Sequence, residues 1–190
     1  MTATATDPVL DNLVVAIYGQ GTAIGEAKDV ERIYGAAYAE SPYFEGPNDV
    51  ADFAKGWRYR ISQPSFRLVV ARLDGAAVGF TFGHQLTAET RWWAGMIDWV
   101  AEETVAERPG RTFAVIELAV DQSLRRHGVA RLLHAHLLAG LAEERATLLV
   151  RPEADAARHA YLSWGYERLG RLRPFPDAPV YDAMVKNLPS

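Results

Sequence analysis

The sequence contains no cysteine. This absence excludes disulfide bonds, thiolate metal ligands and a cysteine nucleophile, and it is compatible with a reducing cytosol. Apolar runs are also short, because none approaches the ~20 residues that a membrane-spanning helix requires. Residues 1–7 lack the basic start and the apolar core of a secretory signal peptide. We therefore expect a soluble, cytoplasmic protein with no membrane partner.

Basic residues do not outnumber acidic ones. The chain has 20 lysines and arginines against 24 aspartates and glutamates, a formal net charge of −4. A general nucleic-acid-binding protein needs a basic surface, so we expect no nucleic-acid partner. Of the 190 residues, 49% are hydrophobic and 23% are charged, which is typical of globular proteins. Residues 1–190 are long enough to bury a sizeable core and most simply form one domain.

The stretch 113–141 combines a buried strand with an amphipathic helix. Residues 113–120 form an apolar, β-branched run that is interrupted only by Glu117, which predicts a mostly buried strand. A basic turn that contains Gly128 follows this run. Apolar residues then recur at helical spacing, at Val129, Leu132, Leu133, Leu137 and Leu141.

A turn of this kind suits an anionic ligand. The first N–H groups of a helix have no partner within the helix, and the helix dipole places partial positive charge there. A glycine lets a ligand approach the backbone closely, and flanking arginines add full charge, so the pattern favours a pyrophosphate. The alternative is an ordinary strand-to-helix connection whose arginines are solvated.

The motif Arg125-x-x-Gly128-x-Ala130 resembles motif A of the GNAT superfamily of acyl-CoA-dependent N-acyltransferases. In that family, backbone amides of the motif hold the pyrophosphate of coenzyme A. The segment from Tyr161 to Tyr166 is similar to the family's later Tyr-x-x-x-Gly-Phe/Tyr signature, and Ala157 matches the alanine that precedes it. The sequence departs from the family at Ala154, where an asparagine often contacts the coenzyme arm.

The resemblance implies a set of coenzyme-binding residues. The strand backbone would pair with the pantetheine arm as an added strand does, and the Val120 amide would stabilise the oxyanion. The arginines would contact phosphates, or they form an ordinary solvated face, while His127 would contribute only its backbone N–H. The expected coenzyme-binding residues are Leu118, Ala119, Val120, Arg125, Arg126, His127, Gly128, Val129, Ala130 and Arg131.

Two side chains are candidates for catalysis. Glu117, in the buried strand, could take a proton from an ammonium, and burial would raise its pKa toward neutrality. The alternative is a structural acid paired with an arginine such as Arg111. Tyr161 stands where many family members place the general acid for the thiolate, and its phenol can donate a proton or a hydrogen bond. The alternative for Tyr161 is a core aromatic side chain.

The remaining pattern predicts a mixed α/β fold. The expected order is β-α-α-β-β-(α)-β-α-β-α-β-β, which fits the GNAT fold, a central mixed sheet flanked by helices. Asp29 could cap the first helix, and Asp74 with Gly75 suits a tight hairpin turn. The other expected elements are strands at 13–18, 66–74, 76–84, 147–150, 166–172 and 180–186, and helices that carry Val30 to Tyr38, Val50 to Ile61, and the segment from Asp155 to Trp164, before Gly165.

Residues 85–111 are an insertion before the central strand. The apolar residues of 87–107 are spaced mostly for a helix, and three tryptophans are costly to expose to water. This insertion could cover the core, form a homodimer surface or wall an acceptor pocket, to which Trp92 and Trp93 would contribute. In acyltransferases of the family that this chain resembles, the loop between the first two helices commonly lines the acceptor pocket, so the resemblance implies that Tyr43 and Phe44, together with Glu45, are further pocket candidates. Packing on the core is the alternative for these aromatic residues.

The function that we expect is acetyl-CoA-dependent N-acetylation of a primary amine of a small molecule, by direct transfer in a ternary complex. A protein N-terminus or lysine as acceptor is the first alternative. A catalytically silent acyl-CoA-binding sensor is the second. We expect no metal site, because His134 and His136 lie two residues apart and point to different faces of their helix. A longer acyl donor and a homodimer remain open.

Overall fold

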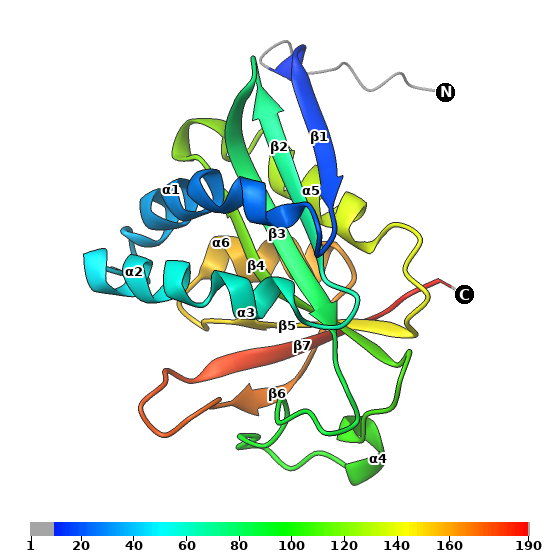
Figure 1. Cartoon of the computed structure of the whole chain (residues 1–190). Coiled ribbons are helices and arrows are strands. Elements are labelled where there is room, and N and C mark those ends of the chain that lie inside the picture. The colour runs from blue at the N-terminus through cyan, green and yellow to red at the C-terminus, as the bar shows by residue number, and fades with distance from the viewer. Residues whose placement is uncertain (1–9, 190) are drawn as a thin grey trace, which may run out of the picture.

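The computed structural model of the protein describes residues 10–189, and residues 1–7, which were considered above as a leader, lie outside this range. One seven-stranded sheet in the order β1-β2-β3-β4-β5-β7-β6 forms its centre (Figure 1). The predicted mixed α/β fold is therefore confirmed. The strands are β1 (Leu13–Tyr18), β2 (Arg67–Leu73), β3 (Ala76–Gln85), β4 (Thr112–Val120), β5 (Arg145–Val150), β6 (Glu167–Leu172) and β7 (Tyr181–Asn187).

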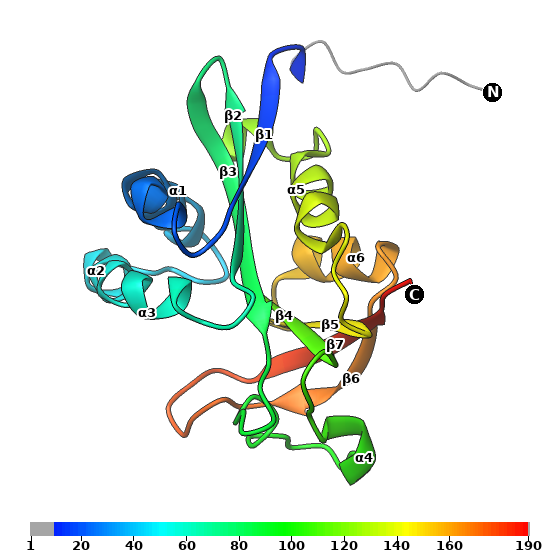
Figure 2. The ribbon, with the colours of Figure 1, turned by 45° about the vertical axis from the view of Figure 1, so that its right-hand side comes forward.

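Helices cover both faces of the sheet. Helices α1 (Ala27–Tyr38), α2 (Pro47–Lys55) and α3 (Trp57–Ile61) lie on one face, and α5 (Val129–Leu138) and α6 (Asp155–Ser163) lie on the other (Figure 2). Strand β2 is buried on both faces, because Leu68 and Val70 join the core under α1–α3 while Val69 and Ala71 join the core under α5.

The two central strands diverge along their length. β4 and β5 are parallel neighbours, but they pair only from Thr112–Ala114 of β4 to Arg145–Thr147 of β5. Beyond Ala114 the edge of β4 toward β5 has no strand partner within residues 10–189. On its other side β4 pairs with β3, where a register shift leaves Ile116 between the pairs Phe82–Glu117 and Gly83–Val115. Glu117 therefore lies next to a β-bulge, at the opening between β4 and β5.

Several local predictions are confirmed. Asp74 and Gly75 both have positive φ, 49° and 84°, as a tight hairpin turn between β2 and β3 requires. Gly165 follows the end of α6 with φ 89°. β6 and β7 pair antiparallel as the closing strands.

The helix boundaries differ from the predictions at three places. A 3-10 helix, η2 (Ala23–Glu26), precedes α1, so Asp29 lies inside the first turn of α1 and binds Arg72 at 2.8 Å instead of capping. The second predicted helix is divided at Gly56 into α2 and α3. Helix α5 ends at Leu138, so Leu141 lies beyond a turn at Gly140, whose φ is 68°.

The insertion is present, but the predicted helix over 87–107 is wrong. Only α4 (Glu102–Val105) is helical there, and most of the segment forms turns and extended chain along the edge of β6 (Figure 1). The Ile97 N–H donates to the Arg171 carbonyl and the Arg173 N–H donates to the Gly95 carbonyl, both at 2.9 Å. Because β6 takes these backbone groups, they are not available to a helix.

Buried polar groups fix the insertion to the sheet. Glu107 and Arg145 form an ion pair at 2.9 Å, and their side chains are 1% and 8% exposed. The same Glu107 oxygen accepts hydrogen bonds from Trp93 at 2.8 Å and Thr112 at 2.9 Å. Trp92 and Trp93 pack with Leu172 and other residues of β6 and β7. The insertion thus covers the β6 end of the core.

No helix in the part of the chain that the structure describes is long and apolar enough to cross a membrane.

Candidate active site

Glu117 lies at the opening between β4 and β5, and its carboxylate is held by a tyrosine. The Tyr38 hydroxyl, at the end of α1, donates to Glu117 Oε2 at 2.5 Å. The Glu117 carbonyl accepts a hydrogen bond from the Thr81 hydroxyl at 2.7 Å. The alternative partner considered above, Arg111, instead donates to the Ala106 and Glu103 carbonyls. The structure therefore places no arginine ion pair on Glu117 within the described residues.

The environment of Glu117 shifts its titration to neutral pH. Burial raises the pKa of Glu117 to about 7, while the Tyr38 hydrogen bond and the charge of Arg60 act in the opposite direction. The nearby carboxylate of Glu45 raises this pKa further. A carboxylate with a pKa near the working pH is suited to accept a proton and release it again.

Tyrosines form one wall of the space around Glu117. The Tyr38 ring lies 4.5 Å from the Tyr34 ring and 4.7 Å from the Tyr43 ring, between centroids. The Tyr34 hydroxyl donates to Glu45 Oε2 at 2.5 Å. Burial raises the pKa of Tyr43 to about 12 and holds that of Tyr38 well above its usual value, so these hydroxyls are neutral donors.

The wall across from α1 comes from the ends of β5 and β7. Arg151 follows β5, and its guanidinium carbon lies 5.8 Å from the centroid of the Tyr43 ring. Tyr181 opens β7; burial raises its pKa, while Arg151 lowers it and Glu117 raises it. Tyr181, Tyr43, Arg151 and Glu117 thus lie within electrostatic range of one another.

The structure does not bring all four acceptor candidates together. Tyr43 contacts the tyrosine wall, but Phe44 beside it is 73% exposed, with φ 53°. Trp92 and Trp93 belong to the cluster on β6 and β7, which shares no residue with the group around Glu117. The structure places these two tryptophans in packing positions.

Tyr161 approaches the same space from α6. Its ring packs 5.5 Å from Trp164 and 5.8 Å from Tyr166, between centroids. Burial raises the pKa of Tyr161, and the nearby Tyr43 and Glu117 raise it further. Among the described residues its hydroxyl has no hydrogen-bond partner, so this donor is available to a ligand.

The turn at Gly128 leads directly into a helix, as the sequence predicted. After the 3-10 helix η3 (Gln122–Leu124), Arg126 and Gly128 adopt positive φ, 70° and 83°, and α5 begins at Val129. The amides of Val129, Ala130 and Arg131 stand in the first helical turn, where no acceptor within the helix exists. Apart from Gly128 and its two chain neighbours, no residue places a heavy atom within 4 Å of the position that a Gly128 Cβ would occupy, so the backbone is open to a ligand there.

The arginines of the turn have different surroundings. Arg125 forms an ion pair with Glu40 at 2.7 Å, which links the turn to the segment after α1. Arg126 and Arg131 are exposed and form no ion pair with any residue that the structure describes. Cationic groups are therefore present on both sides of Gly128, while His127 is partly buried.

The open edge of β4 continues from Glu117 toward this turn. The Asp121 N–H donates to the Val78 carbonyl of the β3 side at 2.8 Å. Backbone groups alternate in direction along a strand. The N–H of Ala119 therefore faces β3, like that of Asp121, and the N–H groups of Leu118 and Val120 face the unpaired edge on the β5 side. Arg125 Nε lies 3.4 Å from the Val120 carbonyl, which agrees with this direction.

No group of three or more histidine, aspartate or glutamate side chains suited to a metal ion occurs in residues 10–189. His134 Nε2 instead lies 2.9 Å from the Tyr166 hydroxyl, and burial lowers the pKa of His134 to about 4. His136 Nδ1 lies 2.9 Å from the Leu132 carbonyl.

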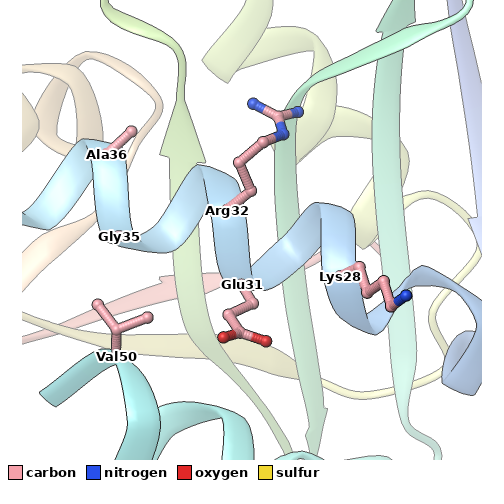
Figure 3. A pocket seen from close by; sticks show the side chains of 6 residues that line it. All are labelled: Lys28, Glu31, Arg32, Gly35, Ala36 and Val50. Atoms are coloured by element: carbon pink, nitrogen blue, oxygen red, sulfur yellow. The ribbon is translucent and has the colours of Figure 1, made fainter. Parts of the chain in front are cut away.

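A separate hollow of about 400 Å³ lies on the surface between α1 and α2. Glu31 and Arg32 point to opposite sides of α1 there (Figure 3). Arg32 is already engaged, because its guanidinium donates to the Ala77 carbonyl. The hollow contains no predicted site residue; it is lined by Lys28, Glu31, Arg32, Gly35, Ala36 and Val50.

A family model described as "Acetyltransferase (GNAT) family" matches residues 29–166. The chain belongs to the GNAT acetyltransferase family. The matched range includes Glu117, the turn at Gly128 and Tyr161. The protein is therefore an acyltransferase by family, as the sequence motifs indicated.

Solved structures share the GNAT fold with this chain. The Corynebacterium glutamicum protein described as histone acetyltransferase HPA2 and related acetyltransferase is 19% identical, with a TM-score of 0.64 over 94% of this chain and 98% of its own. The Escherichia coli ribosomal-protein-S18-alanine N-acetyltransferase is 17% identical, with a TM-score of 0.62 over 93% and 96%. The PaiA N-acetyltransferase of Thermoplasma acidophilum, in complex with coenzyme A, is 9% identical, with a TM-score of 0.60 over 92% and 99%. A comparison with curated proteins found no match.

Sequence reasoning missed several residues around Glu117. Tyr34 and Tyr38 lie four residues apart in the predicted first helix, and this spacing is a signal in the sequence that both hydroxyls lie on the same side of it. Arg151 and Tyr181 gave no local signal, because the fold brings them to Glu117 from the ends of two later strands.

Proposed function

We propose that this GNAT enzyme transfers an acetyl group from acetyl-CoA to a primary amine of a small molecule, in a ternary complex. The observation that carries the proposal is the position of Glu117, whose pKa is about 7, on the open edge of β4 that leads to the turn at Gly128. A proton acceptor and a coenzyme-binding edge on one strand are what direct transfer requires.

The residues present fit acetyl-CoA. The open backbone at Gly128 and the first-turn amides of Val129, Ala130 and Arg131 suit a pyrophosphate. The outward N–H groups of Leu118 and Val120 suit the pantetheine arm. Solved GNAT structures with coenzyme A bound, including that of PaiA, support this assignment. When bound, acetyl-CoA supplies the thioester that is cleaved.

Glu117 and Tyr161 then have different roles in proton transfer. Glu117 accepts a proton from the ammonium of the acceptor, which frees the nitrogen lone pair to form the new C–N bond. The Val120 N–H donates to the carbonyl oxygen as negative charge develops there. The Tyr161 hydroxyl donates a proton to the sulfur as the C–S bond breaks. The nitrogen loses two protons in all: the one that Glu117 takes before attack passes to solvent, and the second leaves as the C–N bond forms and replaces, through solvent, the proton that Tyr161 gives to the sulfur.

A direct test is coenzyme A thiol release by the purified chain with acetyl-CoA and a panel of primary amines. We expect thiol release that depends on the amine. Mass spectrometry should identify the product as the amine with one acetyl group in place of one hydrogen. Acetyl-CoA binding by calorimetry without turnover on any acceptor would instead support the catalytically silent sensor.

The panel should include peptides with a free N-terminus and with lysine. Among the solved structures of the same fold is an N-acetyltransferase of ribosomal protein S18 alanine, so a protein acceptor is the alternative. A peptide with a higher kcat/KM than every small amine would overturn the small-molecule acceptor and leave the transferase. A longer acyl-CoA series tests the acetyl donor in the same assay.

Three further expectations belong to this proposal. We propose that residues 1–190 form one domain, that the protein is cytoplasmic, and that its partners are the small amine and acetyl-CoA. Limited proteolysis tests the first, cell fractionation tests the second, and size-exclusion chromatography with light scattering decides between monomer and homodimer.

A further inference from the structure

Arg151 is a cation with unsatisfied hydrogen-bonding capacity next to the proposed acceptor site. Its side chain is 23% exposed, and its buried Nε has no hydrogen-bond partner among the described residues. The carboxylate paired with it, that of Glu153, is 3.7 Å away and is itself 63% exposed. A guanidinium carries five N–H donors, and buried donors in native proteins normally have partners. Arg151 is therefore suited to an acceptor group that a ligand supplies.

A continuous chain of contacts connects Arg151 to Glu117. The Arg151 guanidinium lies 5.8 Å from the Tyr43 ring, and that ring lies 4.7 Å from the Tyr38 ring. The Tyr38 hydroxyl in turn lies 2.5 Å from Glu117. The positive group and the carboxylate thus stand at two ends of one tyrosine wall.

Other arginines near this space are already engaged. Arg60 donates to the Phe53 carbonyl at 3.0 Å and lies over the Phe53 ring at 4.8 Å. Arg125 is paired with Glu40 at 2.7 Å. Arg151 differs from both, because its only ion pair in the described chain is long and exposed to solvent.

We propose that Arg151 binds a carboxylate of the acceptor, so that the substrate is an amino-carboxylate whose amine faces Glu117. The inference rests on the proposed function, because it assigns the acceptor class of the same site. An arginine fork forms two parallel hydrogen bonds with a carboxylate, which gives both affinity and orientation. Tyr43 lies between the two charges in this chain of contacts, and burial raises the pKa of Tyr43 and of Tyr181, so both hydroxyls are neutral.

The experiment compares amino acids with their primary amides and their decarboxylated amines, so that only the carboxylate changes. With the unaltered enzyme, we expect kcat/KM for the acid to exceed that for the matched amide by about 10- to 100-fold, the range for a hydrogen bond to a charged group. Varying the spacing between amine and carboxylate, from α- to γ-amino acids, then identifies the preferred length.

The variant Arg151→Gln should raise KM for the acid by about 10- to 100-fold and leave KM for the amide and for acetyl-CoA unchanged. Arg151→Lys keeps the charge and should restore part of the preference. The matched control is Arg158→Gln, which removes an equal charge from α6, where Arg158 pairs with Asp182 at 3.7 Å. This control should keep the preference for acids.

The outcomes separate the two proposals. Thiol release with amines but without preference for acids, or an unchanged preference in Arg151→Gln, would overturn the role of Arg151 and leave the transferase intact. Loss of acetyl-CoA affinity in Arg151→Gln would assign Arg151 to the coenzyme and would also overturn it. No thiol release with any acceptor would overturn the proposed function itself. The comparison of acids with amides uses the unaltered enzyme, so it tests the preference for a carboxylate even if a variant fails to fold.

Discussion

At the scale of single residues, the partner of Glu117 determines what this carboxylate can do. An arginine beside it would hold the pKa of a carboxylate low and leave a weak base. A tyrosine hydroxyl satisfies one oxygen without adding charge, so burial dominates and raises the pKa of Glu117 to about 7. The carboxylate is then both hydrogen-bonded and able to take a proton near neutral pH.

The variant Tyr38→Phe tests this balance. It removes a hydrogen bond to the charged form of Glu117, so the pKa of Glu117 should rise by about one unit. A base must be deprotonated to act, so kcat/KM at pH 7 should fall several-fold and recover by about pH 9. The measurement is the pH profile of kcat/KM with one amine. Tyr34→Phe is the control, because its hydroxyl binds Glu45; an acid limb that is the same in all three proteins would contradict the assignment.

The Tyr161 hydroxyl, which has no hydrogen-bond partner in the described part of the chain, lies where the proposed mechanism needs a donor. Tyr161→Phe keeps the ring and its contacts with Trp164 and Tyr166, so packing should be preserved. We expect kcat to fall by about 100-fold, in the range for loss of a general acid, with little change in the Kd of acetyl-CoA by calorimetry. Unchanged turnover would leave Tyr161 a packing residue.

At the scale of elements, the turn before α5 is the part that the coenzyme proposal depends on most. The variant Gly128→Glu places a negative side chain where the pyrophosphate is expected, and we expect acetyl-CoA binding to be lost in calorimetry. Gly128 has φ 83°, so any side chain there adds backbone strain of about 1–2 kcal/mol. Gly128→Ala carries the same strain without the charge and should keep most of the affinity. If Gly128→Glu binds acetyl-CoA as tightly as Gly128→Ala, the pyrophosphate is elsewhere.

One buried ion pair contributes to the attachment of the insertion. Glu107→Ala leaves Arg145 charged and buried without its carboxylate, which should cost about 3–5 kcal/mol of unfolding free energy. Urea denaturation measures this change. The control Glu103→Ala alters an exposed residue of α4 and should change stability by less than about 0.5 kcal/mol. Equal stability of the two variants would mean that the pair does not fix the insertion.

At the scale of the whole molecule, sequence patterns predicted the elements whose conformation is set by residues close together in the sequence. The strand with Glu117, the turn at Gly128 and the Asp74-Gly75 hairpin all form from residues adjacent in sequence. The helix within the insertion was predicted wrongly because the backbone there pairs with β6, a partner that the apolar spacing of the insertion cannot reveal. The positions of Arg151 and Tyr181 near Glu117 were not predicted for the same reason, since only the divergence of β4 and β5 brings these residues toward Glu117.

Two buried groups oppose each other in the pH dependence of folding. The pKa of Glu117 rises from 4.5 to about 7 in the folded state, so between these values the folded chain binds more protons and stability falls as pH rises. The pKa of His134 falls from 6.5 to about 4, so between these values the unfolded chain binds more protons and stability rises with pH. Over pH 4.5 to 6.5 the two contributions offset each other.

Glu117→Gln should therefore make the His134 contribution visible. The stability of this variant should rise by roughly 3 kcal/mol relative to the unaltered protein between pH 4.5 and 7, an upper figure set by 1.36 kcal/mol per pKa unit. The reciprocal variant His134→Gln keeps an amide to bond with Tyr166 and should lose about the same amount over pH 4 to 6.5, while the double variant should show neither slope. Urea unfolding at four pH values measures all four proteins. If the unfolding free energies of the four proteins changed in parallel with pH, folding would not shift the pKa of either side chain. That result would remove the reason to expect Glu117 to act as a base at neutral pH.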